Sequence, residues 1–250
     1  MGRVFIGTSG WSYRSWRGDF YPPGVSSRGF LGFYASRFDT AEINCSFYHA
    51  PPPQTYQKWA AEVPRHFVFS VKANRMITHV RQLSDVRTTW GTFVHHARML
   101  GCHLGPILLQ FPESFRVDLP RLSRFLHQTQ THVWNSPRLR LAFEFRHGSW
   151  FTDEVYALLC RHDVALCIAD STRYPRRDVV TAHFAYLRFH GRDELFASSY
   201  ADEALTAEAR GIRQHLRRGL DVYVYFNNDA NGHAVRNAET LRHIIAEQKP

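Results

Sequence analysis

The sequence predicts an α/β fold, a single (β/α)8 barrel of the TIM type that covers residues 1–250. Short apolar runs that end in polar residues occur eight times, and segments with the apolar spacing of a helix lie between most of them. Such alternation is typical of a parallel sheet with helical crossovers, and 250 residues is the usual length of one barrel. Neither a Gly/Ser-rich linker nor an internal repeat indicates a second domain.

The expected strands are apolar runs of four to six residues. In chain order they cover residues 4–9, 40–45, 67–72, 107–110, 141–146, 166–170, 186–190 and 222–227. Buried parallel strands are normally apolar on both faces, yet most of these runs end in charged or amide residues. The pattern therefore predicts a polar mouth at the carboxyl ends of the strands, where barrel enzymes have their active sites.

Helices are expected after most strands, because apolar residues recur there at helical spacing. The expected helices cover residues 30–38, 54–63, 88–100, 118–133, 155–159, 205–216 and 235–245. Pro64 would stop the second helix, and Asp118 with Pro120 would start the fourth. Residues 171–183 have few apolar repeats, so they are predicted to be mostly loop and the barrel to be irregular around its sixth helix.

The chain is basic, which bears on its partners. It has 31 Lys and Arg against 22 Asp and Glu, a formal net charge of +9. A positive field attracts anions, and nucleic acid or a phosphorylated small molecule would be a suitable partner. The charge could equally serve solubility alone, so both interpretations stay open at this point.

Two further features concern location. No apolar stretch approaches the roughly 20 residues that a membrane span needs, and the N-terminus leads into a strand without a signal peptide. The four cysteines show no CxxC spacing and are expected to be buried thiols rather than disulfides or zinc ligands. We therefore expect a cytoplasmic protein without membrane contact, and infer no protein partner.

In a barrel, the polar strand ends would meet in one mouth. The residues expected there are Glu42, Asn44, Lys72, Gln110, Glu144, Arg146, Asp170, Arg188, His190 and Asn227. Side chains two residues apart share a face of a strand, so Glu144 should lie with Arg146, and Arg188 with His190. Apolar residues can often replace a buried set of ion pairs without loss of stability, which favours a ligand site over a purely structural lattice.

Three cations are expected to hold an anionic group: Lys72, Arg146 and Arg188. A guanidinium group can donate two parallel hydrogen bonds to two oxygens of one phosphate or carboxylate. The alternative is that these cations pair with Glu144 and Asp170. Lys72 could also form a Schiff base if it is desolvated, whereas an ion pair would keep it protonated. Amide and aromatic residues complete the expected substrate site, namely Asn44, Gln110, Asn227, Asn228, Trp11 and Tyr13.

The expected catalytic residues are Glu144, His190 and Asp170. Burial and neighbouring charges can bring Glu144 and His190 near neutral pH as a general acid and base. The three could instead converge on a divalent metal, but Arg146 and Arg188 would repel a cation and no HxH or HExxH motif is present. No metal ligands are therefore predicted, and the cofactor stays unknown.

Loops beyond the strand ends add aromatic and basic residues. The aromatic ones are Trp11, Tyr13, Trp16, Phe47, Tyr48 and Trp150. They could stack on bases or sugars, or they could form an apolar lid on the barrel. Arg173, Arg176 and Arg177 form a basic cluster that could follow a nucleic-acid backbone. Asn227 and Asn228 begin the loop before the last helix, a corner where such barrels often bind phosphate.

Several motifs give the chain a family resemblance. They are residues 7–13 (GTSGWSY), 42–44 (EIN), 69–72 (FSVK), 77–79 (ITH), 109–112 (LQFP), 144–147 (EFRH), 186–191 (YLRFHG) and 225–229 (YFNND). With these motifs the chain resembles the DUF72 (YecE-like) family over almost its whole length. The resemblance implies a TIM-type barrel similar to the xylose isomerase and endonuclease IV group. It supplies no activity.

The function expected from these observations is an enzyme that binds an anionic substrate, phosphorylated or derived from nucleic acid, at the mouth of the barrel. Its chemistry would be acid–base or metal-assisted cleavage of a phosphoester. The alternative is a non-catalytic nucleic-acid-binding module that uses the basic loops and the aromatic residues. A third possibility is a barrel that sequesters a small metabolite.

Overall fold

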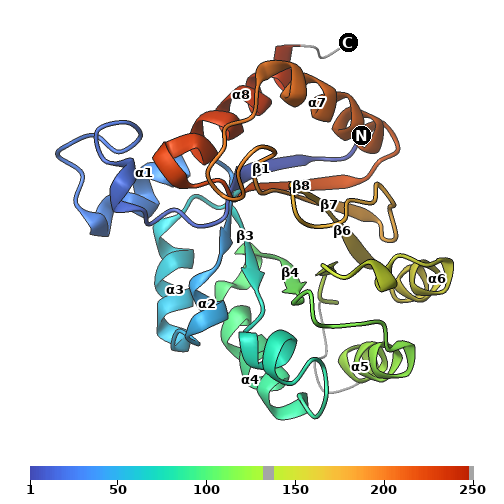
Figure 1. Ribbon diagram of the computed structural model, residues 1–250. Helices are drawn as coiled ribbons and strands as arrows, with labels where there is room; N and C mark the ends of the chain where they lie inside the picture. The colour runs from blue at the N-terminus through green and yellow to red at the C-terminus, as the bar shows by residue number, and fades with distance from the viewer. Residues whose placement is uncertain (132–137, 248–250) are drawn as a thin grey trace.

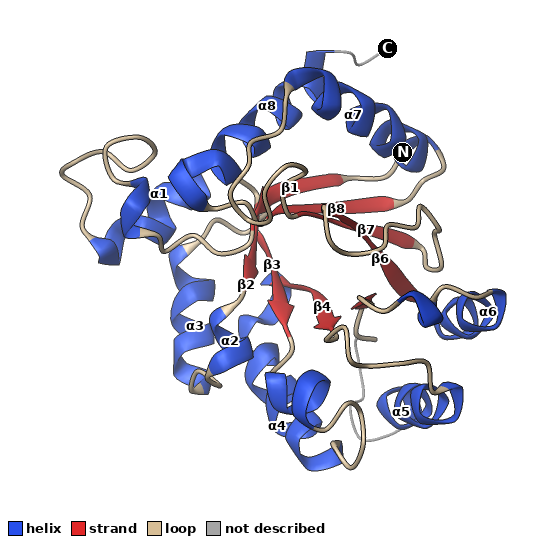
Figure 2. Ribbon diagram, in the orientation of Figure 1, coloured by secondary structure: helices blue, strands red, loops and turns tan. Residues whose placement is uncertain are grey.

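The computed structural model describes residues 1–131 and 138–247. Within these ranges, eight parallel strands form one sheet in the order β1-β8-β7-β6-β5-β4-β3-β2. The first and last strands of this order, β1 (Val4–Thr8) and β2 (Thr40–Ile43), meet through a bridge between Ser9 and Glu42. The helices surround the strands (Figures 1 and 2). The predicted TIM-type barrel is confirmed.

The remaining elements follow the predicted order, except that the short helix α2 (Cys45–Tyr48) was not predicted and begins where the second strand was expected to end. The other strands are β3 (Val68–Lys72), β4 (Leu104–Gln110), β5 (Leu141–Glu144), β6 (Val164–Asp170), β7 (Phe184–Phe189) and β8 (Asp221–Phe226). The helices are α1 (Phe30–Arg37), α2 (Cys45–Tyr48), α3 (Pro53–Glu62), α4 (Arg87–Ala97), α5 (Leu119–Thr131), α6 (Asp153–His162), α7 (Asp202–Arg217) and α8 (His233–Glu247). The expected end of the fourth helix at Val133 lies outside the described residues. Residues 171–183 contain no helix, so β6 and β7 are joined by a loop, as predicted.

Alternation along the strands separates two apolar regions. Side chains of one parity fill the barrel interior, and those of the other parity pack against the helices in a larger core. The interior cluster consists of Phe5, Leu108, Ala142, Ala165, Cys167, Phe184, Tyr186, Tyr223 and Tyr225. A polar side chain near the end of a strand can therefore reach the mouth only if its position in the alternation points it into the barrel.

Hydroxyl pairs cross the interior just below the mouth. The Tyr186 hydroxyl lies 2.7 Å from Ser70 Oγ and donates to Glu42 Oε2 at 2.8 Å. The Tyr225 hydroxyl lies 2.7 Å from Thr40 Oγ1. Burial raises the pKa of both tyrosines well above the usual range, so they stay neutral. These contacts give hydrogen-bond partners to the buried hydroxyl groups below the mouth and to the Glu42 carboxylate.

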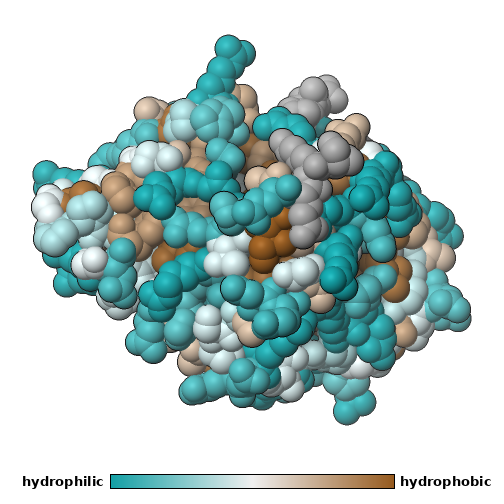
Figure 3. Space-filling view, turned by 90° about the horizontal axis from the view of Figure 1, so that it is seen from above, coloured by the Kyte–Doolittle hydropathy of each residue, from teal (hydrophilic) through white to brown (hydrophobic). Residues whose placement is uncertain are grey.

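The outer face is polar where the helices meet solvent. α6 shows why: Thr152 caps its first turn, acidic residues begin it, and Arg161 and His162 end it, which suits the helix dipole. The face seen in Figure 3 is mostly hydrophilic, with hydrophobic residues in small scattered areas. Among the described helices, none is both long and apolar enough to cross a bilayer.

The expectation of four buried thiols is wrong for three of them. Cys167 is buried in the barrel interior, but Cys45, Cys102 and Cys160 are exposed, and all four are free. The apolar residues around the exposed cysteines in the sequence belong to helices and turns whose opposite faces are buried.

Tyr34 gives a test of how α1 is attached to the barrel. Its fully buried hydroxyl accepts from the Thr8 N–H at 2.9 Å and donates to the Thr40 carbonyl at 3.1 Å. Tyr34→Phe leaves both backbone groups buried without this partner, and should lower the free energy of unfolding by about 1–3 kcal/mol in urea denaturation. The control, Tyr48→Phe at a side chain 66% exposed, should change little. Equal effects of the two substitutions would contradict this account.

Candidate functional site

Arg188 lies at the centre of the mouth. It comes from β7 and is 1% exposed. Its Nε and Nη2 donate to the two oxygens of Glu42 at 3.0 and 2.8 Å, and its Nη1 donates to Glu144 Oε2 at 2.6 Å. Ser9 Oγ donates to Glu42 Oε1 at 2.8 Å. One guanidinium thus joins the ends of β2, β5 and β7. Four of its five N–H groups are used by Glu42, Glu144 and Ser9, so its main role is structural, and its binding of a substrate anion stays a prediction.

Glu144 is shared between two arginines. Its Oε1 accepts from Arg146 Nε at 2.9 Å, and its Oε2 accepts from Arg188. Burial alone would raise the pKa of Glu144, but the two guanidinium groups outweigh burial and hold it well below the usual range. Glu144 is therefore ionised at neutral pH and does not serve as a proton donor there.

Arg146 lies nearer the rim, with 14% of its side chain exposed. Its Nη1 donates to the Tyr174 hydroxyl at 2.9 Å, and its guanidinium lies 3.9 Å from the centre of the Tyr174 ring. Its Nε donates to Glu144. Among the described residues, no acceptor lies within hydrogen-bond distance of its third nitrogen, Nη2. Arg146 can therefore offer a donor to a ligand while its position is fixed from two sides.

Lys72 ends β3 and is half-buried at the mouth. No described carboxylate lies within 4.0 Å of its Nζ, which is 4.2 Å from the centre of the Phe47 ring. Burial lowers the pKa of Lys72 most, and Arg188 lowers it further; Glu144 and Glu42 offset part of this, and the result is about 7. The expectation of an ion-paired lysine is wrong, because Arg188 has taken both carboxylates.

Two buried polar atoms at the mouth have no hydrogen-bond partner among the described residues: Nε2 of His190 and Oδ1 of Asn44. His190 is fully buried, its Nδ1 lies 3.1 Å from Asn227 Nδ2, and its Nε2 lies 3.6 Å from Glu144 Oε2. Burial lowers the pKa of His190 although Glu144 opposes the change, so the imidazole is neutral at neutral pH. The expected proximity of Glu144 and His190 is present.

Gln110 and His79 form the side of the mouth above β4. Gln110 is 2% exposed and its Nε2 donates to the Phe111 carbonyl at 2.6 Å. The His79 ring lies 4.9 Å from the Phe47 ring, edge to face. Burial lowers the pKa of His79 to about 4, and Lys72 contributes to the decrease. His79 therefore places a neutral imidazole against the same ring that Lys72 contacts.

A cavity of about 490 Å³ lies beside the mouth. It is lined in part by three predicted site residues, Asn44, Trp11 and Tyr13. Trp11 packs its ring edge to face on Trp59 at 5.4 Å, and the Tyr13 hydroxyl donates to the Ser9 carbonyl at 2.6 Å. Asn44 follows the end of β2 directly and lines this cavity.

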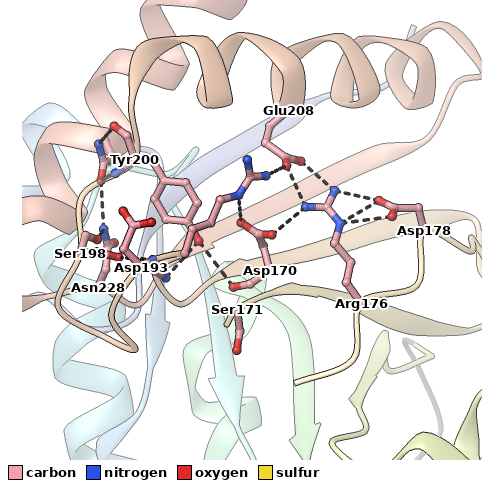
Figure 4. Close-up of polar contacts among 12 residues, drawn as sticks. Asp170, Ser171, Arg176, Asp178, Asp193, Ser198, Tyr200, Glu208 and Asn228 are labelled. Atoms are coloured by element: carbon pink, nitrogen blue, oxygen red, sulfur yellow. Dashed lines mark hydrogen bonds and ion pairs between the residues drawn. The ribbon is translucent and has the colours of Figure 1, made fainter. Parts of the chain in front are cut away.

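Asp170 does not join Glu144 and His190. Cys167 points into the barrel, so Asp170, three residues further along β6, points outward. Its carboxylate accepts from Arg176 at 3.1 Å and from Arg192 at 2.8 Å, and both arginines also bind Glu208 of α7 (Figure 4). The expectation that Asp170 lies in the mouth is wrong because of this outward direction, and its catalytic role stays a prediction.

The predicted basic cluster is largely neutralised within the protein. Arg173 pairs with Glu113 at 2.7 Å, and Arg176 pairs with Asp178 at 2.8 Å in addition to Asp170 and Glu208. These ion pairs attach the β6–β7 loop to its surroundings. They leave less positive charge for a nucleic-acid backbone than the sequence suggests.

Asn228 and two of the six aromatic residues expected in the loops are fully buried rather than presented to a ligand. Asn228 is fully buried and donates to the Ser198 carbonyl at 2.8 Å and to Asn237 Oδ1 at 2.9 Å, so it holds a loop against α8 (Figure 4). Trp16 and Trp150 are fully buried. Alternation after β8 turns Asn228 away from Asn227. Its Oδ1 is buried without a hydrogen-bond partner among the described residues, and its part in substrate binding stays a prediction.

The residues do not fit a metal ion. Within residues 1–131 and 138–247, no group of three His, Cys, Asp or Glu side chains is placed to hold one. Both oxygens of Glu144 accept from arginines, and Asp170 lies in another cluster. We derive no step through a metal.

Ser9, Tyr186 and Tyr174 belong to the site but were not identified from the sequence. Ser9 ends the first expected strand and donates to Glu42. Tyr186 holds Glu42, and a signal was present, because Tyr186 lies two residues before Arg188 on the same face of β7. Tyr174 contacts Arg146 from the β6–β7 loop, and no periodicity marks it there.

Comparison with known proteins identifies one family over most of the chain. The model of a family described as "Protein of unknown function DUF72" matches residues 5–250. A curated relative, the UPF0759 protein YunF of Bacillus subtilis (strain 168), is 24% identical over 278 residues, which cover 97% of this chain and 94% of the relative.

Solved structures agree in fold. A DUF72 family protein from Thermotoga maritima MSB8 is 28% identical with a TM-score of 0.86, over 98% of this chain and 99% of the other. A DUF72 family protein from Enterococcus faecalis V583 is 19% identical with a TM-score of 0.83, over 99% of this chain and 97% of the other. The second likeness concerns the fold alone.

Substitution of Arg188 tests the ion-pair network. Arg188→Met leaves two buried carboxylates without their main partner, and should lower the free energy of unfolding by about 3–5 kcal/mol in urea denaturation. The matched control is Arg65→Met, at an exposed arginine before the amino end of β3, which should change stability by less than about 0.5 kcal/mol. If Arg188→Met lowered the free energy of unfolding as little as Arg65→Met does, the assigned role of Arg188 would be refuted.

Proposed function

The chain belongs to the DUF72 family, and from the geometry of its mouth we propose that it is an enzyme that binds an anionic substrate there and acts on it by acid–base chemistry. Phosphorylated compounds and compounds derived from nucleic acid are the first candidates. The proposal rests on the described side chains and not on any activity of a relative.

The observation that carries this proposal is the charge imbalance at the mouth. Two carboxylates, Glu42 and Glu144, face three cations, Arg188, Arg146 and Lys72. Arg188 binds both carboxylates, so Lys72 is left without an acidic partner and its pKa falls to about 7. An anion would supply the missing negative charge and restore the positive charge of the lysine.

The binding groups lie around this point. Arg146 offers Nη2 as a donor, and Lys72 offers its ammonium group. Asn44 adds a buried oxygen that has no partner, which could accept from a substrate hydroxyl or amine. Arg188 supports the site from below by fixing the carboxylates. The neighbouring 490 Å³ cavity has room for a further part of the substrate.

Proton transfer is assigned to neutral groups. His190 is neutral and its Nε2 has no protein partner within hydrogen-bond distance, and Lys72 is half protonated near neutral pH. Glu144 stays ionised and orients Arg146 and Arg188. Cleavage of a phosphoester is one reaction that these groups suit. An arginine would bind the phosphate and the neutral amine of Lys72 would take a proton from water; the Nε2–H of His190 would donate a proton, since Nδ1 accepts from Asn227.

The alternative of a non-catalytic nucleic-acid-binding module has less support. Stacking on bases needs exposed rings, yet Trp16 and Trp150 are fully buried and Trp11 is 8% exposed. Among the aromatic residues named for this role, Tyr48 is the one with a largely exposed ring, at 66%.

Sulfate tests anion binding, because its charge is constant around pH 7. Binding should be tightest at pH 6 and weaken by about five- to tenfold by pH 8, because Lys72 loses its proton as pH rises through about 7. The measurement is isothermal titration calorimetry at low ionic strength. Lys72→Gln should bind sulfate more weakly at pH 6 and show no such pH dependence.

Two controls accompany this titration. Arg65→Gln removes an exposed positive charge at the other end of the barrel and should leave the profile unchanged. Titration with single-stranded DNA at increasing salt addresses the alternative, which expects steeply salt-dependent binding that Lys72→Gln does not alter. Sulfate binding that is absent, or identical in wild type and Lys72→Gln, would overturn the proposed function.

A further inference from the structure

The amine of Lys72 has surroundings that suit a nucleophile better than a simple charge. We propose that Lys72 forms an imine with the carbonyl group of an anionic substrate, a compound that carries an aldehyde or ketone together with a carboxylate or phosphate. This inference rests on the proposed function and adds its substrate class and its covalent step.

The contacts of Lys72 leave its nitrogen able to react. The Nζ lies 4.2 Å from the centre of the Phe47 ring, and no described carboxylate approaches within 4.0 Å. The half-buried side chain leads from the end of β3 into the mouth. A lysine becomes a nucleophile when burial and nearby cations favour its neutral form. Burial in the mouth, Arg188 and Arg146 do so here, and they outweigh the face of the Phe47 ring, which favours the ammonium form.

Lysine is rare in this chain, which makes a lysine in the mouth notable. The chain has 31 basic residues, but only three of them are lysines: Lys58, Lys72 and Lys249. Arginine provides nearly all of its positive charge, and arginine binds anions at least as well as lysine. A lysine in the mouth, among arginines, provides what a guanidinium cannot, which is an amine that loses its proton near neutral pH.

The step balances without a cofactor. The substrate's anionic group binds Nη2 of Arg146, and the carbonyl carbon is attacked by Lys72 in those molecules whose amine is still neutral with the anion bound, a fraction that increases with pH. A proton moves from nitrogen to the former carbonyl oxygen to give a neutral carbinolamine. This oxygen then leaves as water with the second proton of the amine, and the neutral imine that remains takes up a proton from solvent. His79 lies 4.9 Å from the same Phe47 ring, and its neutral imidazole can accept and return the transferred proton.

Reductive trapping tests the proposal on the intact chain. Wild-type protein is incubated at pH 7 with glyoxylate or with glycolaldehyde phosphate, each together with sodium cyanoborohydride, and the adducts are located by peptide mass spectrometry. Lys72 should be modified at least about tenfold faster than Lys58, which borders the neighbouring cavity with 70% of its side chain exposed, because the pKa of about 7 leaves roughly half of Lys72 neutral at pH 7. The two probes distinguish a carboxylate from a phosphate preference, and either preference supports the proposal.

Neutral glycolaldehyde is the control for the anionic group, and it should label Lys72 more slowly than its phosphate ester. Lys72→Arg keeps a positive charge and should abolish the fast adduct, whereas Lys58→Arg should keep it. Labelling that follows exposure, with Lys58 first, would overturn the proposal. If a variant fails to fold, the wild-type ratio of Lys72 to Lys58 still decides.

Failure of this inference differs from failure of the proposed function. Sulfate binding with the expected pH dependence, together with slow labelling of Lys72, would leave the anion site in place and refute the imine. The absence of both would refute the two proposals together.

Discussion

The structure of the mouth depends on the ion pairs of one buried arginine. Arg188 satisfies Glu42 in a bidentate manner and reaches across to Glu144, so three strand ends are held together where a barrel is otherwise open. Buried charges are stable only when they are paired and hydrogen-bonded, and here Ser9 and Tyr186 complete the shell of Glu42. The remaining charges at the mouth are arranged around this pairing.

Charge balance then determines what is left for a ligand. The two carboxylates are used by Arg188 and Arg146, so Lys72 is a third cation without a partner and loses much of its basicity. The same groups keep Glu144 ionised and His190 neutral, although the two side chains lie 3.6 Å apart. The mouth thus combines fixed positive charge with groups that can exchange protons.

A second ion-pair network supports the site from outside the barrel. Asp170 and Glu208 share Arg176 and Arg192, which attaches the irregular loop after β6 to α7. The loop in turn places Tyr174 against Arg146. A connection that lacks a helix can therefore still position a side chain at the mouth, because charge pairs supply the order that helix packing would supply.

The sequence alone determined the barrel, its element order, its irregular loop and most of the polar strand ends, because strand and helix periods are local properties of the chain. It also brought Glu144, Arg146, Arg188 and His190 to one mouth. Tertiary structure decided which charges pair. The outward direction of Asp170 and the isolation of Lys72 depend on strand parity and on competition for two carboxylates, and that competition exists only once distant strands have met.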